Sequence, residues 1–526
     1  MIRSVCIRAA FLLSVAIVGF NGTVARAQQS EPASPPKQAD PPVNAASNPT
    51  KVAVNSKQKA KSAGKQQDAT NPDQNPAQQQ YGLPRNPILG PPPDTDLTKP
   101  LTLDRAIRIG LARQNSIAIA QTDIEIANAR LTQARSSFFP TVTPSYQFQT
   151  NLVPSKRFDP ISQQRIANGT FSQETNSSGI IARQVIFDSG RRETSVNLSR
   201  RNTFAAQYGL GDQRQNVVLN VTQDYYNLLR DKELVRVQEE SVRRAETTRD
   251  VIKAQAEAGS AAQSDILQAE ADLANARVAL LGAQNDYNVA QASLKNAMGL
   301  VTSNPIVLPN TEIPTPDTKP DPIGLEKYVQ RSYLNRLDIK QQQERVYAQG
   351  YSVRLAQINN GVTLDATVSE GFAADPVSGE ERTFTVALSY PLFDGGNTRA
   401  AVRENKAALE SARRSLDQLE QVVRLNVETS YLTREQARQR IIATQLAVQA
   451  AQLGYEVALE KQKQQLVNIP EVINAEVQLI NAQVSSVQAI YDFYIADAAL
   501  QRDIGINDPV FVPKVPGAKP PVPVRP

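Results

Sequence analysis

The stretch "QVIFDSGRRETSV" (Gln184–Val196) decides the fold, because its pattern recurs later in the chain as "YPLFDGGNTRAAV" (Tyr390–Val402). In both stretches an apolar run ends in Phe-Asp-x-Gly, and the chain then becomes charged. The change predicts a junction at which a strand ends and a long helix begins, and the chain builds this junction twice. The predicted strand–helix junction residues are Phe187, Asp188, Gly190, Phe393, Asp394 and Gly396.

The two stretches belong to a much longer internal repeat. At an offset of 206 residues, Tyr225 falls on Tyr431 and Leu294 on Leu500. Before the junction the offset becomes 222, so the first copy holds 16 extra residues (222 minus 206), placed between residues 150 and 179. This self-similarity indicates the internal duplication of a large unit. It predicts repeat 1 at residues 101–303, a Pro-rich linker at 304–322 and repeat 2 at residues 323–506.

Seven-residue periodicity predicts long helices that pack closely in coiled coils. One seam places Ile266, Leu273, Leu280, Tyr287 and Leu294 against Ala269, Ala276, Ala283, Ala290 and Ala297. Small residues at alternate seam positions allow helices to approach closely. Residues 189–258 contain no proline, and at about 1.5 Å per residue a helix there would span on the order of 100 Å. Gly209 and Gly211 are the candidate break points in this helix.

Period-two alternation predicts four strands, two in each copy. "TVTPSYQFQT" (Thr141–Thr150) and "TFTVALSYPLF" (Thr383–Phe393) alternate clearly, "VTLDATVSE" does likewise, and "GIIARQVIF" is less regular. A transmembrane β-barrel uses such strands, and so does a half-buried sheet in a soluble protein. Aromatic residues at one end of the strands favour the membrane. Four strands are too few to close a barrel, since small barrels need about eight, so several chains must combine their strands.

Composition indicates an exported protein and excludes several functions. Residues 1–27 combine Arg3 and Arg8 with the apolar run "AAFLLSVAIVGF" and a small-x-small site at Ala25–Ala27, which predicts a signal peptide. The chain has no histidine, and its single cysteine, Cys6, lies in that peptide. Common zinc sites and histidine-assisted nucleophiles are therefore excluded, and we expect no cofactor, no metal and no enzymatic activity.

The charge of the chain argues against a nucleic-acid partner. The net charge is +5, and removal of the three arginines of the signal peptide leaves +2 (5 minus 3). Residues 28–100 are rich in Pro and Gln and predict disorder, as a solvated tether or as a basic tail that contacts an anionic surface. Residues 507–526 form a Pro-rich C-terminal tail.

From "LTLDRAIRIGLARQNSIAIAQTDIEIANARLTQARSSFFPTVTPSYQF" through "FDSG" and "FDGG" to "GSAAQSDILQAEADLANAR" and "QLVNIPEVINAEVQLINAQ", the sequence resembles the TolC family of outer-membrane efflux proteins. The resemblance covers about residues 101–506. It implies a mixed α/β, mainly α fold and a homotrimer. Each protomer would give four strands to a twelve-stranded outer-membrane barrel and its helices to a periplasmic coiled-coil tunnel. The implied partners are a periplasmic adaptor and an inner-membrane pump of the RND or ABC type.

The resemblance places two helix-hairpin tips nearest the inner membrane. Asp265 and Glu471 are the candidates for an acidic ring that sets the periplasmic aperture and favours cations. The alternative is helix capping, because Ser260 with Gln263 and Asn468 with Glu471 have capping-box spacing. Candidate adaptor contacts at the tips are Gly259, Ser260, Val467 and Asn468.

Three functions therefore remain open from the sequence. The first is the outer-membrane channel of a tripartite efflux system. The second is the exit duct of a type I protein-secretion system, which would use the same machinery. The third is a non-conducting periplasmic coiled-coil scaffold, which would need the helices but not four amphipathic strands.

Overall fold

The computed structural model describes residues 97, 99–158, 165–309, 316, 319, 322–374, 378–464 and 466–506. All of them belong to the second of two units, which begins at Arg85. The predicted signal peptide, most of the predicted disordered segment and the Pro-rich C-terminal tail lie outside the described residues, as do parts of the linker at 304–322.

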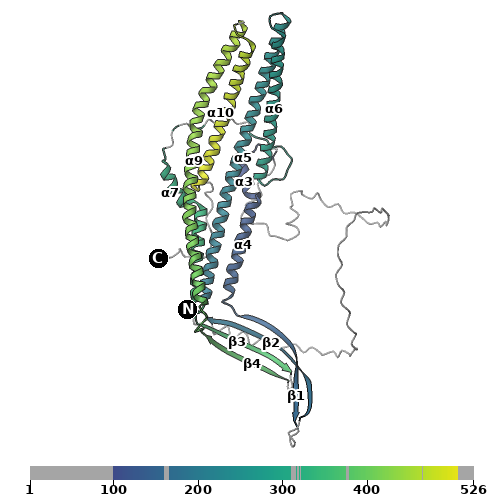
Figure 1. Cartoon of the computed structure of the whole chain (residues 1–526), viewed down its shortest axis with the longest axis vertical. Coiled ribbons are helices and arrows are strands. Elements are labelled where there is room, and N and C mark those ends of the chain that lie inside the picture. The colour runs from purple at the N-terminus through teal and green to yellow at the C-terminus, as the bar shows by residue number, and fades with distance from the viewer. Residues whose placement is uncertain are drawn as a thin grey trace, which may run out of the picture. The chain divides into compact units, whose positions relative to one another are not determined.

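The described chain runs twice through the same order of elements (Figure 1). The first half contains α3 (Leu103–Arg113), α4 (Asn115–Ser136), β1 (Thr141–Phe158), β2 (Arg165–Phe187), α5 (Arg191–Glu257) and α6 (Gln263–Ala297). The second half contains α7 (Leu325–Asn335), α8 (Leu337–Ile358), β3 (Thr363–Ala374), β4 (Ser378–Ser389), α9 (Asn397–Lys463) and α10 (Ile469–Ile504). The fold is mainly helical with one four-stranded sheet, as predicted.

The first long helix has the predicted length, and its equivalent in the second half has the same length. α5 and α9 each contain 67 residues, which corresponds to about 100 Å of helix. α5 continues through Gly209 and Gly211 without a break, so the candidate break points were wrong. Gly211 is buried, and a Cβ on Gly209 would meet Nε2 of the flexible Gln341 side chain at 2.8 Å, so both glycines lie at helix packing contacts.

Helices pack against the long helices along the predicted seams. α5 packs against α4, α6, α8 and α10, and α9 packs against α8 and α10. On α6 the seam residues Ala269, Leu273, Ala290 and Leu294 are buried. No helix among the described residues is both long enough and apolar enough to cross a bilayer.

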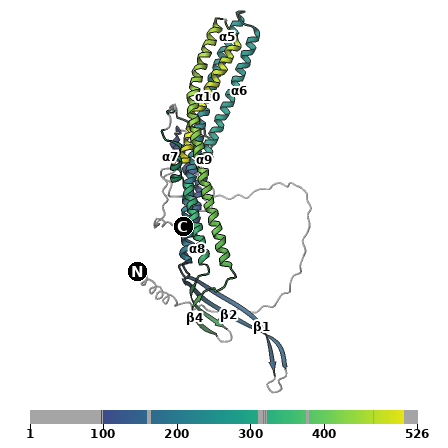
Figure 2. The same cartoon turned by 60° about the vertical axis from the view of Figure 1, so that its left-hand side comes forward.

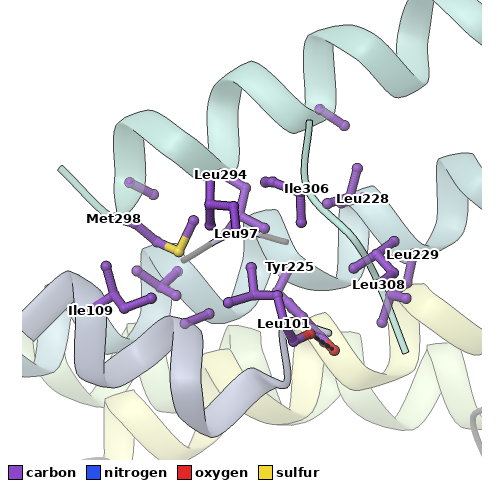
Figure 3. Packing of buried hydrophobic residues seen from close by; sticks show 14 of the residues in the cluster. Leu97, Leu101, Ile109, Tyr225, Leu228, Leu229, Leu294, Met298, Ile306 and Leu308 are labelled. Atoms are coloured by element: carbon purple, nitrogen blue, oxygen red, sulfur yellow. Dashed lines mark hydrogen bonds between the residues drawn. The ribbon is translucent and has the colours of Figure 1, made fainter. Parts of the chain in front are cut away.

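The largest core cluster lies where α3, α5 and α6 meet (Figure 3). Leu101, Leu228 and Leu294 are fully buried there, and the Tyr225 hydroxyl donates a hydrogen bond to the Leu101 carbonyl at 3.1 Å. A second cluster joins α7, α8, α9 and α10 through Tyr328, Val329, Ile339, Val423, Val427, Leu500 and Ile504. Each half of the chain thus has its own core next to its long helix.

The four strands form one antiparallel sheet in the order β1-β2-β3-β4. Figure 2 labels β1, β2 and β4 of this sheet. Most of its apolar residues share one face and remain exposed, with Tyr146 at 73% and Leu388 at 71%. The other face carries Thr, Ser, Gln and an Arg183–Asp365 ion pair. The predicted alternation is therefore present, and the apolar face has no layer of the same chain packed on it among the described residues.

β1 and β2 are longer than β3 and β4. β1 and β2 contain 18 and 23 residues, whereas β3 and β4 contain 12 each. β2 pairs with β3 only from Asn176 onward. The part of the β1–β2 hairpin beyond that residue is a two-stranded ribbon, and it contains the extra residues of the first half.

Two glycines with positive φ allow a matched test of packing. Gly299 has φ +69°, and an added Cβ would meet the Arg113 carbonyl oxygen at 2.8 Å, whereas Gly259 has φ +74° and open space around it. Both alanine variants pay for the left-handed conformation, about 1–2 kcal/mol, but only Gly299→Ala also forces backbone atoms apart. We expect Gly299→Ala to lower the urea midpoint of helix unfolding more than Gly259→Ala. Equal midpoints would contradict this account.

Candidate functional site

Asp188 caps the first long helix at the junction between β2 and α5. β2 ends at Phe187 and α5 begins at Arg191. The Asp188 carboxylate is buried and accepts hydrogen bonds from the Gly190 amide at 3.2 Å and the Arg192 amide at 2.9 Å. Gly190 has φ +85°, which lets the chain turn between strand and helix. Asp188 therefore satisfies amides that a helix N-terminus leaves unpaired.

Arg192 ties this junction together, and sequence reasoning missed it. Its guanidinium donates to Asp188 at 3.0 Å, to the Val185 carbonyl at 2.7 Å and to the Ile186 carbonyl at 3.1 Å. It also lies over the Phe138 ring, 5.0 Å from the centroid. One side chain thus joins the end of β2, the start of α5 and the segment that leads into β1. The sequence signal was the pair of arginines directly after FDSG, of which Arg192 is the second.

The second junction uses the same cap without the arginine. Asp394 accepts from the Gly396 amide at 2.9 Å and the Thr398 amide at 2.8 Å. The Thr398 side chain and these amides lower the pKa of Asp394 below its usual range. β4 ends at Ser389, earlier than the predicted strand that reached Phe393, because Pro391 has no N–H to donate to a sheet. Phe187 and Phe393 are both exposed.

The first junction is also fixed to the second half of the chain. Ser189 has φ +56°, and its hydroxyl donates to the Val362 carbonyl at 2.9 Å, just before β3. A Cβ at Gly361 would meet the Ser189 Oγ at 2.5 Å. A side chain at position 361 would therefore displace Ser189 from the start of β3.

The turn between α5 and α6 is the first predicted tip. Gly259 has φ +74°, and both the amide and the hydroxyl of Ser260 donate to the Gln255 carbonyl, at 2.8 and 2.9 Å. Ser260 thus completes the end of α5 rather than capping α6. The residue before α6 is Ala262, and its amide donates to Asp265 at 3.4 Å. The capping-box pairing of Ser260 with Gln263 was therefore wrong, while Asp265 does cap its helix.

The turn between α9 and α10 is the second predicted tip. Asn468 stands directly before α10 and makes no side-chain capping bond. The Glu471 amide donates to the Asn468 carbonyl at 3.0 Å, and the Glu471 side chain is exposed. Val467 packs against the cluster around Tyr455. Asp265 and Glu471 occupy the same position in the first turns of α6 and α10.

Next to the tips, a hydrogen bond joins the two helix hairpins, and a cavity lies between them. Gln462 of α9 donates to the Gln255 side chain of α5 at 3.1 Å. A cavity of about 450 Å³ lies between α5, α9 and α10. Its apolar lining is Val251, Ile252, Tyr455, Leu459, Ile469 and Val472, and its charged lining is Glu240, Arg243, Arg244 and Lys463. Sequence reasoning identified neither feature, because neither has a local sequence signal.

The sequence of this chain also matches a known protein family. The sequence profile of the outer membrane efflux protein family matches residues 106–300 and 328–505. The chain belongs to this family. The two matched segments cover most of the helices and strands of both halves.

Known proteins are similar to this chain at low sequence identity. The outer membrane efflux protein BepC of Brucella suis is 23% identical over 391 residues, covering 73% of this chain and 81% of BepC. Outer membrane protein TolC of Escherichia coli is 24% identical over 370 residues, covering 65% and 71% of the two chains. The structure is similar to that of the Campylobacter jejuni CmeC outer membrane channel, with a TM-score of 0.66, 18% identity and coverage of 77% and 86%.

Membership of this family identifies the chain as an outer-membrane efflux channel. The family consists of channel proteins rather than enzymes. The third function considered, a non-conducting periplasmic scaffold, is therefore disfavoured.

The junction caps give a second matched test. Asp188→Ala removes the acceptor for two amides and leaves Arg192 without its carboxylate, whereas Asp394→Ala removes only an acceptor for amides. Loss of a helix cap costs about 0.5–2 kcal/mol. We expect faster hydrogen exchange in the first turn of the affected helix, with a larger increase for Asp188→Ala. A larger increase for Asp394→Ala would show that Arg192 does not stabilise the junction.

Proposed function

We propose that three copies of this chain form one duct, with a twelve-stranded barrel in the outer membrane and a tunnel of helices in the periplasm. The duct receives substrates from an inner-membrane pump of the RND or ABC type through a periplasmic adaptor. One observation carries the proposal. The surfaces that join the first half of the chain to the second have repeat equivalents on the outside of the chain, and these outer surfaces have no partner within the described residues.

The strand registers support the internal duplication. Thr141 pairs with Arg183 and Thr363 pairs with Ser389. The second pair follows from the first by the sequence offsets of 222 and 206. Every contact that crosses from the first half to the second should then have an equivalent that crosses from the second half of one copy to the first half of the next.

The contact between α5 and α10 shows what is missing. Inside the chain Tyr226 of α5 stacks on Tyr494 of α10, with ring centroids 5.0 Å apart. The equivalent contact would join α9 to α6, and among the described residues these two helices make no comparable contact. Leu432 is the equivalent of Tyr226 and is 56% exposed. α9 therefore presents a packing face without its helix.

Apolar residues continue along this face and along α6. Leu425, Leu432, Leu446 and Leu453 form an exposed stripe on α9. They fill four of five positions at seven-residue spacing, and the fifth is Gln439. On α6, Val278 and Leu281 are 68% and 66% exposed. Of their equivalents on α10, Val484 lines a cavity with residues of α5 and α6, and Val487 packs against the core cluster that contains Leu228 of α5. An apolar stripe on each helix supports packing of α6 from one copy on α9 of the next.

The sheet supports the same arrangement of three copies in a closed ring. β1 and β4 are edge strands with unpaired backbone groups, which proteins normally cover or close. By the repeat, β2 corresponds to β4 and β3 corresponds to β1. The pairing of β2 with β3 therefore corresponds to a pairing of β4 with β1 of the next copy. The exposed apolar face then contacts lipid and the polar face lines the lumen. Three chains supply the twelve strands that the resemblance to the TolC family implies.

The tips are the proposed periplasmic aperture and adaptor contact. Asp265 and Glu471 stand at equivalent positions, so three copies would place six carboxylates around the opening. Acidic rings favour cations in a narrow pore. Gly259, Ser260, Val467 and Asn468 lie at the same turns and are the proposed contacts with the adaptor. Because Asp265 caps α6 while Glu471 is free of such a bond, we propose that Glu471 contributes more to selectivity.

Assembly is tested by charging the stripe on α9. We expect Leu432→Asp to prevent trimer formation, because it places a charge in an apolar contact. Gln445→Asp is the control, since its equivalent on α5, Glu239, stays exposed although α5 is surrounded by helices. Light scattering coupled to size-exclusion chromatography in detergent measures the mass. A trimer from Leu432→Asp, or the loss of the trimer from Gln445→Asp, would contradict the interface.

Conduction is tested by single-channel recording in planar bilayers. We expect cation-selective currents from the parent and a loss of selectivity in Asp265→Asn with Glu471→Gln. Each single variant separates the two carboxylates, and Glu471→Gln should have the larger effect. Asn substitution keeps an oxygen that accepts the Ala262 amide, so the helix cap is largely retained. Unchanged selectivity in a correctly trimeric double variant would remove both residues from the aperture.

A further inference from the structure

Glu476 is a buried carboxylate at the contact between the two hairpins. It lies on α10, is only 2% exposed and faces α5. The Arg244 Nε lies 3.4 Å from Glu476 Oε1. Neither carboxylate oxygen accepts a hydrogen bond within the described part of the chain, and the Nε and Nη2 atoms of Arg244 are also without a hydrogen-bond acceptor there. A buried ion pair with unsatisfied atoms is costly.

The internal repeat does not reproduce the Glu476–Arg244 ion pair. The repeat equivalent of Glu476 is Glu270, which is exposed, and the equivalent of Arg244 is Ala450. The proposed contact between neighbouring copies therefore has no arginine at this place. Whatever this pair does, it acts on the contact between the two hairpins of one chain.

Every helix around Glu476 contributes a titratable or charged group. α5 contributes Arg244, with Glu240 3.9 Å from the Arg244 guanidinium. α6 contributes Asp272, and α9 contributes Tyr455. Burial raises the pKa of Glu476 to about 7; Arg244 opposes this shift, and Asp272 adds to it. Burial also raises the pKa of Tyr455, and the neighbouring Glu476 charge raises it further, so Tyr455 stays neutral in this range.

The surroundings leave room for the contact to open. Arg244, Tyr455 and Val472 line the cavity of about 450 Å³ between the hairpins. Val472 stands one helical turn before Glu476 on α10. Between the cavity and the tip, the bond between Gln255 and Gln462 joins the hairpins through neutral amides. Water can therefore reach the pair from the cavity once α10 moves away from α5.

We propose that Glu476 and Arg244 make the separation of the α9–α10 hairpin from α5 dependent on pH, with Glu476 as the group that titrates. Burying the neutral carboxyl group of Glu476 costs less free energy than burying the ionised carboxylate, so acid favours the packed hairpins. An ionised Glu476 favours an arrangement in which water solvates it. The packed state is thus stabilised below the ordinary pKa of glutamate, and this stabilisation is lost as pH rises through about 7.

The test measures the distance between the hairpins in the mature protein, after removal of the predicted signal peptide. Cys6 precedes the predicted cleavage site, so Lys253→Cys on α5 and Asn474→Cys on α10 provide label sites for pulsed electron paramagnetic resonance. Both positions are exposed. We expect the population with longer distances to grow between about pH 5 and pH 8.5, by a change in equilibrium constant on the order of a hundredfold. The measurement does not depend on ion conduction, so it can fail or succeed independently of the proposed duct.

Three variants decide the role of the pair. Glu476→Gln keeps the size of the side chain without the charge and should remove the pH response. Glu270→Gln is the matched control and should keep it. Arg244→Gln should move the midpoint to higher pH, because the carboxylate loses a nearby cation, whereas a purely structural role would leave the midpoint unchanged. The proposal is overturned if the parent shows no pH response or if Glu476→Gln keeps that of the parent.

Discussion

The structure depends on one constraint: a chain with four strands and two helix hairpins exposes surfaces that need partners. Both edges of the sheet carry unpaired backbone groups, and its apolar face is exposed. α9 and α6 carry apolar stripes on the faces equivalent to those that α5 and α10 bury against each other. These surfaces are related by the repeat, so additional copies of the same chain can cover all of the helix stripes and strand edges together.

The junctions between strands and long helices transmit this arrangement from the sheet to the helices. Asp188 and Asp394 cap the helices, and Arg192 and Ser189 fix the first junction to neighbouring segments. The direction of each helix is set within a few residues of the sheet. A helix of about 100 Å multiplies any error in that direction, so a buried and fully bonded cap at its start has a large effect on the position of its tip.

Periodicity made most of the fold predictable. The seven-residue seam on α6 and the alternating strands are local patterns, and each specifies one face of one element. Features that join distant segments were missed: Arg192 over Phe138, Gln255 with Gln462, and Arg244 with Glu476. They depend on which helices become neighbours, and a single sequence does not encode that directly. Ser260 had the spacing of a cap, but its hydroxyl bonds backward to Gln255, because the glycine before it turns the chain.

The repeat offsets also specify how β4 of one copy should pair with β1 of the next. Inside the sheet Ile181 pairs with Ser369, and the offsets convert this pair into Ala387 with Gln147. In one chain these residues lie on opposite edge strands, separated by β2 and β3, or about 14 Å at 4.8 Å per strand.

The most direct test is oxidation of an Ala387→Cys, Gln147→Cys variant in outer membranes, with Ala387→Cys, Thr143→Cys as the shifted control. The account predicts a covalent trimer, resistant to heat in detergent until reduced, from the first variant alone. Monomers after complete oxidation, or cross-linking at the shifted pair instead, would contradict the ring.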